Sequence, residues 1–369
     1  MSKESLHKDV FQSQRLRVAR RAHGFTLSEL GEKIGTSRQY ISQLETGLSY
    51  PTVENIEKLS ESLNVKADFF NQPISHPIDI SEAHFRHRLT TPDSIKKEVL
   101  SKLIVFEEFV SVLDETFSMP EVVFPNFVVE SIEDIERAAE KTRIALGVPL
   151  NKPVGNLSRL IEGSGGVIVS FSGHDKRLDA LSVERTRPIF VILESDIKQS
   201  PARVRFDLAH ELGHIVMHGG LETGDKKTET EANRFASAFL MPRTSFLNEF
   251  SEVIERFDWK HIYSMKIKWG VSVAAILKRL FDLNVIDKNL YKRGFIYLSK
   301  TGQRQKERYD DQVKVEEPSI VSKCLQLLEK SNLKKLQLHD KHMLNDVFIS
   351  KVFGQKFEAS AQQNAANDL

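Results

Sequence analysis

The sequence has little of what stabilises secreted and membrane proteins. Its 369 residues include a single cysteine, Cys324, so no internal disulfide framework can form, and such a chain suits a reducing compartment. No apolar run approaches the roughly 20 residues that cross a bilayer, and the start of the chain lacks the apolar stretch of a secretory signal. The net charge of +1 does not demand an anionic partner. We therefore expect a cytoplasmic protein with no membrane partner.

The chain is long enough for two or three domains, and its patterns change along its length. Helical periodicity dominates residues 10–70, and a segment rich in turn-forming residues follows it at 71–81. Short β-branched stretches predict strands at 165–171, 180–184 and 188–194. Further helices are expected at 92–117, 131–146, 154–162, 203–218, 228–241, 268–286 and 319–352.

Two short helices joined at a glycine are predicted near the N-terminus. Thr26 and Glu29 form a T-x-x-E capping box, in which each side chain bonds to the backbone N–H of the other residue. Gly35 then breaks the first helix, and the second is expected from about Ser37 to Glu45. This arrangement predicts a helix-turn-helix, whose second helix presents Arg and Gln side chains suited to guanine and adenine edges. The alternative is a helical hairpin that serves only for packing.

The stretch GFTLSELGEKIGTSRQYISQLETGLSYPTVENIEKLSESLNVKADFF resembles the XRE-like family of lambdoid-repressor domains. The resemblance implies a five-helix domain that binds a double-stranded DNA operator, as a homodimer in most relatives. It also implies a buried ion pair between Arg20 and Glu45. Leu27 departs from the family pattern, because many relatives carry a glutamine there that contacts the DNA backbone. The implied contact residues of the recognition helix are Ser37, Arg38, Gln39 and Gln43.

A second motif, H-E-x-x-H, lies in the stretch LAHELGHIVMHGG at residues 208–220. On a helix, His210 and His214 stack one turn apart, so their imidazoles can hold one zinc ion. Glu211 lies between them and would take a proton from an attacking water molecule. The alternative is a solvated helix face that carries histidines by chance, so a third ligand is needed to support a metal site.

Two carboxylates of the following helix compete for the third ligand position. Glu229 lies at the edge of the apolar side of that helix, whereas Glu231 lies roughly 110° from its centre. Because a carboxylate near a buried side needs a partner or a metal, we predict Glu229 as the ligand. Glu231 is expected to form a capping box with Thr228, and Asn233 to orient a ligand histidine. His218 is either another such partner or simply the polar end of the first helix.

The segments RFDLAHELGHIVMH and ETEANRFASAFLMP resemble the ImmA/IrrE family of cytoplasmic metallopeptidases, and the similarity covers roughly residues 131–290. The resemblance implies that His210, His214 and Glu229 bind the metal and that Glu211 is the general base. The expected cofactor is zinc, with manganese as the alternative. Family members commonly cleave a specific repressor, and some carry a fused XRE-like domain.

These observations predict an α+β multidomain protein. We expect an all-α lambda-repressor-like DNA-binding domain at 1–72, a linker and helical connector at 73–130, a mostly helical zincin-like metallopeptidase domain with a small β-sheet at 131–300, and a helical C-terminal region with a disordered tail at 301–369. The predicted function is a DNA-binding transcriptional regulator that cleaves a protein partner, a repressor or an antitoxin. The alternative is a non-proteolytic repressor or antitoxin whose peptidase-like domain senses a ligand or binds a partner such as a toxin.

Several features near the predicted site carry weaker expectations. An exposed sheet edge commonly pairs with a peptide substrate, but the sequence does not identify the edge strand. Arg205 is a candidate oxyanion stabiliser or a surface charge at a helix start, and Tyr263 is a weaker candidate.

The stretch HFRHR at 84–88 is predicted to be a surface segment and not a metal site. The helix at 92–117 is expected to be a scaffold or a dimer contact.

Overall fold

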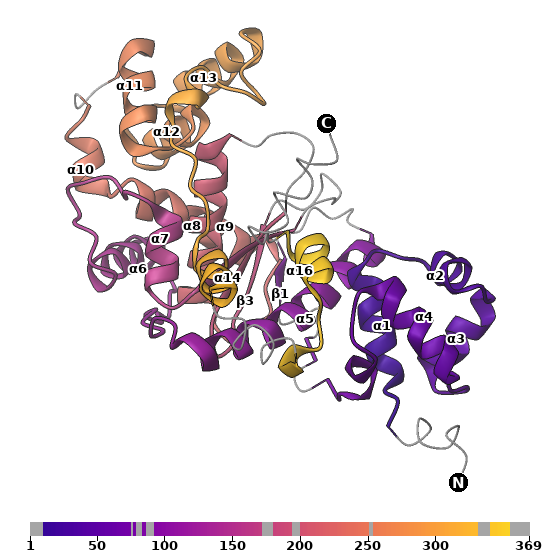
Figure 1. Cartoon of the computed structure of the whole chain (residues 1–369). Helices are drawn as coiled ribbons and strands as arrows, with labels where there is room; N and C mark the ends of the chain where they lie inside the picture. Colours follow the sequence, from indigo (N-terminus) through magenta and orange to yellow (C-terminus); the bar gives the residue numbers. More distant parts are fainter. Residues whose placement is uncertain are drawn as a thin grey trace, which may run out of the picture.

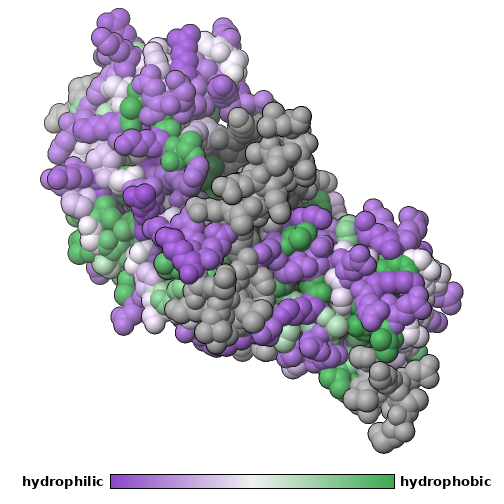
Figure 2. Space-filling model, in the orientation of Figure 1, coloured by the Kyte–Doolittle hydropathy of each residue, from purple (hydrophilic) through white to green (hydrophobic). Residues whose placement is uncertain are grey.

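The chain folds into a small helical part and a larger part built around a β-sheet (Figure 1). The computed structural model describes residues 10–74, 77–78, 83–85, 92–171, 180–193, 200–250, 254–330 and 340–354. The predicted disordered tail and residues 86–88 of the predicted surface segment lie outside these ranges. Within them, no helix combines the length and the apolar character that crossing a membrane requires. Hydrophilic residues cover most of the face drawn in Figure 2, and hydrophobic ones form small scattered groups.

The N-terminal part is a helix-turn-helix domain. Its elements are α1 (Ser13–Ala22), α2 (Leu27–Ile34), α3 (Arg38–Thr46), α4 (Val53–Leu63) and the 3-10 helix η2 (Ala67–Asn71). The predicted capping box is confirmed, because the Glu29 N–H donates to Thr26 Oγ1 at 3.1 Å and the Thr26 N–H to Glu29 Oε2 at 2.6 Å. Gly35 ends α2 at φ 73°, in the left-handed region that glycine adopts at little cost. The expected fifth helix is a single 3-10 segment.

A buried ion pair ties α1 to the recognition helix α3, as the family resemblance implied. Arg20 donates from Nε to Glu45 Oε1 at 2.5 Å and from Nη2 to Glu45 Oε2 at 2.9 Å. Arg20 also donates to the backbone oxygen of Phe25, at the turn that leads into α2. Both charged side chains are buried, so the charge of each one compensates for the water that the other has lost.

Within the described residues, the sheet has four strands in the order β1-β3-β4-β2. They are β1 (Ala83–Phe85), β2 (Val167–Phe171), β3 (Ala180–Val183) and β4 (Ile189–Leu193). β2 and β4 run parallel, whereas β3 is antiparallel to both β4 and β1. The three β-branched stretches identified in the sequence are β2, β3 and β4. β1 is an additional strand, contributed by the segment that was predicted to be a linker.

Helices cover both faces of the sheet. One face packs on α5 (Asp93–Phe117), α14 (Ile320–Glu329) and α16 (Asp346–Phe353). The other face packs on α7 (Leu157–Gly163) and α8 (Pro201–Met217). Behind them, α9 (Lys226–Leu240) packs on α8, and α6 (Ile132–Ala145) packs on both α8 and α9. Alternate residues of β2 enter the two cores, so Val167 and Val169 face α5 while Ile168 faces the other way. This part also contains α10 (Arg243–Leu247), α11 (Trp259–Trp269), α12 (Val273–Asp282) and α13 (Lys288–Lys300).

Helix α5 joins the two parts of the molecule. The core of the helix-turn-helix domain and the core on one face of the sheet form one continuous cluster of buried residues that includes α5. Arg15 of α1 donates to both carboxylate oxygens of Glu108 in α5, at 2.6 and 2.8 Å. It also donates to the backbone oxygens of Gln72 and Pro73, where the chain leaves the helix-turn-helix domain. The expectation of a scaffold helix is therefore confirmed, while its role in a dimer stays a prediction.

Buried ion pairs and hydrogen bonds attach the polar segment at 301–318 to the larger part. It contains the short 3-10 helix η4 (Asp310–Gln312). Lys266 of α11 is fully buried and donates to Glu307 Oε2 at 2.7 Å and to Asp310 Oδ1 at 2.6 Å. Glu307 also accepts from the backbone N–H of Val273 at the start of α12, at 2.7 Å. This segment therefore fixes the positions of α11 and α12.

Candidate metal centre and recognition helix

Helix α8 carries the H-E-x-x-H motif through the interior of the larger part. It begins with Pro201 at its first turn, where the missing N–H has no cost, and it ends at Met217. His210, Glu211 and His214 are all fully buried. The alternative of a solvated helix face is therefore wrong, because these polar groups lie between α8, the sheet and α9.

Helix α9 begins earlier than the sequence analysis predicted. Asp225 is its N-cap residue and accepts from the Thr228 N–H at 2.7 Å, so the predicted capping box of Thr228 with Glu231 is wrong. An aspartate three residues ahead of Thr228 competes for the same role, and Asp is among the best N-cap residues. Glu231 is thereby free of the helix end and bonds to His218 instead.

The helices α8 and α9 approach each other closely at Gly213. A Cβ atom added at Gly213 would lie 3.0 Å from Cδ1 of Phe235 in α9, which is tighter than ordinary van der Waals contact. The absence of a side chain at this position lets α9 settle against α8. This contact brings the first turn of α9, and Glu229 with it, within reach of the motif.

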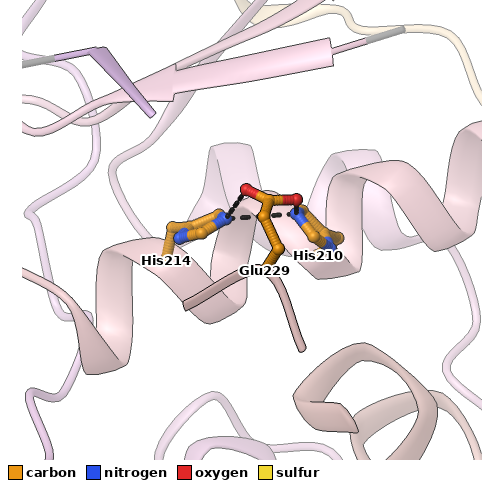
Figure 3. Close-up of side chains that lie close together, drawn as sticks. All are labelled: His210, His214 and Glu229. Carbon is orange, nitrogen blue, oxygen red and sulfur yellow. Dashed lines mark hydrogen bonds and ion pairs between the residues drawn. The ribbon is translucent and has the colours of Figure 1, made fainter. Parts of the chain in front are cut away.

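Three potential metal ligands converge between these helices (Figure 3). Glu229 Oε2 lies 3.4 Å from His210 Nε2, and Glu229 Oε1 lies 3.4 Å from His214 Nε2. The two Nε2 atoms are 3.1 Å apart. All three ligand atoms lie within 4.8 Å of one another, although Glu229 comes from a different helix and is 15 positions beyond His214. The structure thus brings together the residues that the sequence analysis selected.

The hydrogen-bond partners of the two Nδ1 atoms determine the tautomers of His210 and His214. A ring that is protonated at Nδ1 has an unprotonated Nε2 atom facing the cluster. His210 Nδ1 lies 3.2 Å from Asn233 Oδ1, an acceptor, so the Nδ1 atom carries the proton. His218 Nε2 lies 3.0 Å from Glu231 Oε2, so Nε2 of neutral His218 donates and its Nδ1 accepts. His214 Nδ1 lies 3.0 Å from that Nδ1 atom and therefore donates to it. Both ligand histidines are left with an Nε2 lone pair directed at Glu229.

This donor set fits a divalent cation. Two nitrogen lone pairs and a carboxylate that face one another are all acceptors, and they repel unless a positive charge lies between them. Burial by itself would raise the pKa of Glu229, but His210 and His214, whose protonated rings would donate to its carboxylate, outweigh burial and hold the pKa well below its usual value. Two imidazoles and one carboxylate are a ligand set typical of catalytic zinc, which keeps a fourth position open.

Glu211 lies beside the ligands on α8 and is held by the sheet. Its Oε2 atom accepts from the hydroxyl of Ser182 in β3 at 2.7 Å. Ser182 is fully buried, so its hydroxyl is directed at Glu211 by the packing of β3 on α8. Sequence analysis did not identify Ser182, since a serine in a short apolar strand has no pattern that marks it as a functional residue.

His84 is also part of this site, and its prediction as a surface residue is wrong. It lies in β1 with 3% of its surface exposed. Its ring stacks on that of His214, with centroids 5.1 Å apart and planes inclined by 8°. Its Nδ1 atom lies 2.7 Å from Thr223 Oγ1. Burial lowers the pKa of His84 to about 3, and nearby His214 and His218 add to this effect, so the ring is neutral near pH 7.

Neither candidate oxyanion stabiliser is directed at the cluster. Arg205 is buried and donates to the backbone oxygens of Val154, Gly155 and Gly270, and it pairs with Glu316. It therefore connects α8 to three other segments of the chain. The alternative prediction of a surface charge is also wrong, because the side chain is buried. Burial lowers the pKa of Arg205 to about 10, so it stays charged. The Tyr263 hydroxyl donates to Gln303, 2.8 Å away, in the segment that follows α13.

The recognition helix presents its predicted contact residues at the surface of the N-terminal part. Ser37 is the N-cap of α3 and accepts from the Tyr40 N–H at 3.1 Å. Arg38 and Gln39, in the first turn, are exposed, and Gln43 is half-buried one turn later. Ile41 and Leu44 on the opposite side are fully buried in the domain core. The exposed start of α3 has the side-chain chemistry that reads base edges in a major groove.

Comparisons with known proteins agree with both parts of this description. A family model described as helix-turn-helix matches residues 16–70, and a model of peptidase family M78, described as IrrE N-terminal-like domain, matches residues 162–281. The HTH-type transcriptional regulators SinR of Bacillus subtilis and Bacillus licheniformis are each 40% identical over 53 residues, which is 14% of this chain and 48% of theirs. The chain thus matches about half the length of these relatives.

The two parts of the chain therefore belong to known families. Residues 16–70 form an XRE-type helix-turn-helix domain, and residues 162–281 belong to the IrrE/ImmA-like peptidase family M78. The chain thus carries an XRE-type helix-turn-helix domain and an M78 peptidase-like domain.

Proposed function

We propose that this protein is a DNA-binding transcriptional regulator and a metal-dependent endopeptidase, which cleaves a specific protein partner while its N-terminal domain binds an operator. The observation that carries the proposal is the convergence of His210, His214 and Glu229, with Glu211 beside them. The partner would be a repressor or an antitoxin, met in the cytoplasm. The expected ion is zinc, with manganese as the alternative, since both accept nitrogen and carboxylate ligands.

The chemistry divides between the ion and the residues around it. Zinc held by the three ligands would supply a Lewis acid and would lower the pKa of a water molecule to about 7. Glu211 would accept a proton from the attacking water and pass it to the leaving amine. The Ser182 hydroxyl would hold the Glu211 carboxylate in place, and Asn233 and His218 would hold the ligand rings in the tautomer that binds.

The N-terminal domain would locate the regulator on DNA. Ser37, Arg38, Gln39 and Gln43 would contact the operator, with Arg38 suited to guanine and the glutamines to adenine. An XRE-type domain of this size reads one half-site, so we also propose a homodimer on a palindromic operator.

A change at Glu211 tests the peptidase. The full-length protein is loaded with zinc and incubated with the purified repressor or antitoxin encoded beside its gene, and cleavage is followed by mass spectrometry. Glu211→Gln should slow cleavage at least ~100-fold, because it removes the general base, yet bound zinc should stay near one equivalent. The control is Glu222→Gln, on an exposed position of the loop after α8. Equal cleavage by the wild type and Glu211→Gln would contradict the proposal.

A second candidate function is supported by a cavity of about 880 Å³ between α6, α9 and α12. Its lining includes apolar Ile135 and Phe206, charged Arg234, and Asn233, which also contacts His210. A ligand bound there would touch a partner of the metal site, so the domain would act as a sensor without cutting. In cells, regulation that persists in Glu211→Gln but is lost in Gln39→Ala would favour this function over proteolysis.

A further inference from the structure

Strand β1 does not belong to the matched peptidase segment. The family match at 162–281 includes β2, β3, β4, α8 and α9, whereas β1 comes from residues 83–85, between the helix-turn-helix domain and α5. Without β1, the strand order would end at β3. The peptidase-like segment therefore has a sheet edge at β3 that this chain covers with a segment of its own.

The covered edge lies directly beside the candidate catalytic group. β1 and β3 are antiparallel, and His84 is the partner of Ser182 in their register. The Ser182 hydroxyl bonds to Glu211. Directly opposed residues of an antiparallel pair direct their side chains to the same face of the sheet. His84 therefore points from β1 toward the motif helix, next to Ser182.

The side chain of His84 fills space over a candidate metal ligand. Its ring stacks on His214, and a bond to Thr223 anchors it on the loop after α8. Figure 3 draws strands of the sheet above the cluster of His210, His214 and Glu229, and the stacking of His84 on His214 shows that β1 contacts one of these residues. A peptide that pairs with β3 would have to occupy the same backbone positions as β1.

We propose that the outer edge of β3 is the docking site for an extended segment of the protein substrate, and that β1 occupies this site in the resting protein. The substrate segment would run antiparallel to β3, and its backbone would replace that of β1 by strand addition. This inference rests on the proposed peptidase function and adds to it a regulated step, the departure of β1. A strand of three residues makes few ladder bonds, so it is suited to being exchanged.

Two sets of variants test whether a substrate segment replaces β1 on β3. One set fixes β1 in place with a disulfide, and the other weakens its pairing with β3. Ala83 and Val183 are register partners, and their side chains enter the core on the α5 face, away from the ligands. Directly paired residues of antiparallel strands have Cα atoms about 4.5–5.5 Å apart, within the range of disulfides. Ala83→Cys with Val183→Cys should therefore lock β1, and each single substitution is a control. The opened variant is Ala83→Pro/His84→Gly/Phe85→Pro, in which two backbone N–H groups are lost.

The readout is binding of a fluorescent peptide with the sequence of residues 79–89, DISEAHFRHRL, to zinc-loaded full-length protein carrying Glu211→Gln. The opened variant should bind it at least tenfold more tightly than the unlocked protein. The oxidised double cysteine should bind at least tenfold more weakly, and reductant should restore binding, while a scrambled peptide should bind none of them. Equal affinities in the opened, unlocked and locked forms, with zinc bound in all three, would overturn the inference.

The same variants separate this inference from the proposed function. With Glu211 restored, a partner protein cut equally fast by the locked and the opened forms would overturn strand exchange and leave the peptidase intact. Peptide binding that follows the lock, without cleavage by any form, would support the docking site and contradict the peptidase.

Discussion

At the scale of single residues, the candidate metal site depends on groups outside the proposed ligand set. Asn233 accepts from His210, and its own amide donates to the Glu229 backbone oxygen at 2.7 Å. One side chain therefore fixes the ring of one ligand and the helix turn that carries another. Such outer partners are typically worth 10–100-fold in metal affinity.

Removing this side chain should weaken the metal site without a change in the ligands. Asn233→Ala is expected to lower the affinity for zinc about 10–100-fold, because His210 loses the acceptor that selects its tautomer. The measurement is a zinc titration against a chromophoric chelator. Thr230→Ala is the matched control on α9, since the Thr230 hydroxyl bonds only to the Lys226 backbone oxygen among the described contacts. Equal affinities in the two variants would show that Asn233 does not orient the ligand.

Sequence patterns were sufficient for the residues that lie on one helix or on two consecutive helices. The spacing of His210 and His214 and the angular position of Glu229 follow from helix geometry alone. His84 and Ser182 could not be found in this way, because their proximity to the motif arises only when β1 pairs with β3 and the sheet packs on α8. Glu231 was misassigned because Asp225 takes the N-cap position of α9, and the Glu231 carboxylate bonds instead to His218, just after the end of α8.

At the scale of elements, helix ends and strand lengths set the limit of prediction. The start of α9 had two competing caps, Asp225 and Thr228, and the T-x-x-E pattern at Thr228 and Glu231 favoured the wrong one, although Asp caps helices better than Thr. β1 is three residues long, shorter than any reliable alternation of polar and apolar residues. The β-branched segments β2 and β4, by contrast, were found because both of their faces are buried.

The end of α1 carries a histidine that should link stability to pH. His23 donates from Nε2 to the Leu63 backbone oxygen at 2.8 Å, and its ring meets Phe348 of α16 edge-on at 5.1 Å. Burial lowers the pKa of His23 below its ordinary value of 6.5, although the bond to Leu63 opposes this effect. The folded state therefore binds fewer protons than the unfolded state at pH values between the folded pKa and 6.5.

The sign of the pH dependence follows from this difference. As the pH falls through 6.5 toward the lowered folded pKa, unfolding takes up a proton and the free energy of unfolding decreases. His23→Gln keeps an N–H donor for Leu63 but does not titrate, so it should lose less stability over this range than the wild type. Urea unfolding at about pH 7.5 and about pH 5.5 measures both, and other histidines cancel in the comparison. A histidine protein that loses no more stability than the glutamine variant would contradict the assignment.

At the scale of the whole molecule, the DNA-binding and peptidase-like parts share one core. α5 belongs to the cluster that continues from the helix-turn-helix domain to one face of the sheet. The boundaries predicted at residues 72, 130 and 300 remain predictions, but the packing across α5 indicates that the parts depend on each other for stability. Family resemblance identified the parts separately and had no information on this contact.

Unfolding should therefore be cooperative across both parts. Leu103 of α5 is fully buried in the shared cluster, and Leu103→Ala should cost about 2–5 kcal/mol. Fluorescence of the two tryptophans, Trp259 and Trp269, reports on the larger part, and amide hydrogen exchange reports on α1 to α4. Both should shift by the same amount, with Ser111→Ala, an exposed position of α5, as the control. Separate transitions in calorimetry would contradict a shared core.

The close approach at Gly213 changes what the five-letter motif means in this chain. A search for H-E-x-x-H treats the two middle letters as free choices. Here Leu212 is fully buried, and a Cβ atom at Gly213 would lie 3.0 Å from Phe235 Cδ1, closer than ordinary van der Waals contact. Four of the five residues of the motif are thus fully buried side chains, and the fifth, Gly213, is the point where α9 packs closely on α8. In this protein the residues of the motif therefore serve the packing of α8 against α9 as well as the candidate metal site.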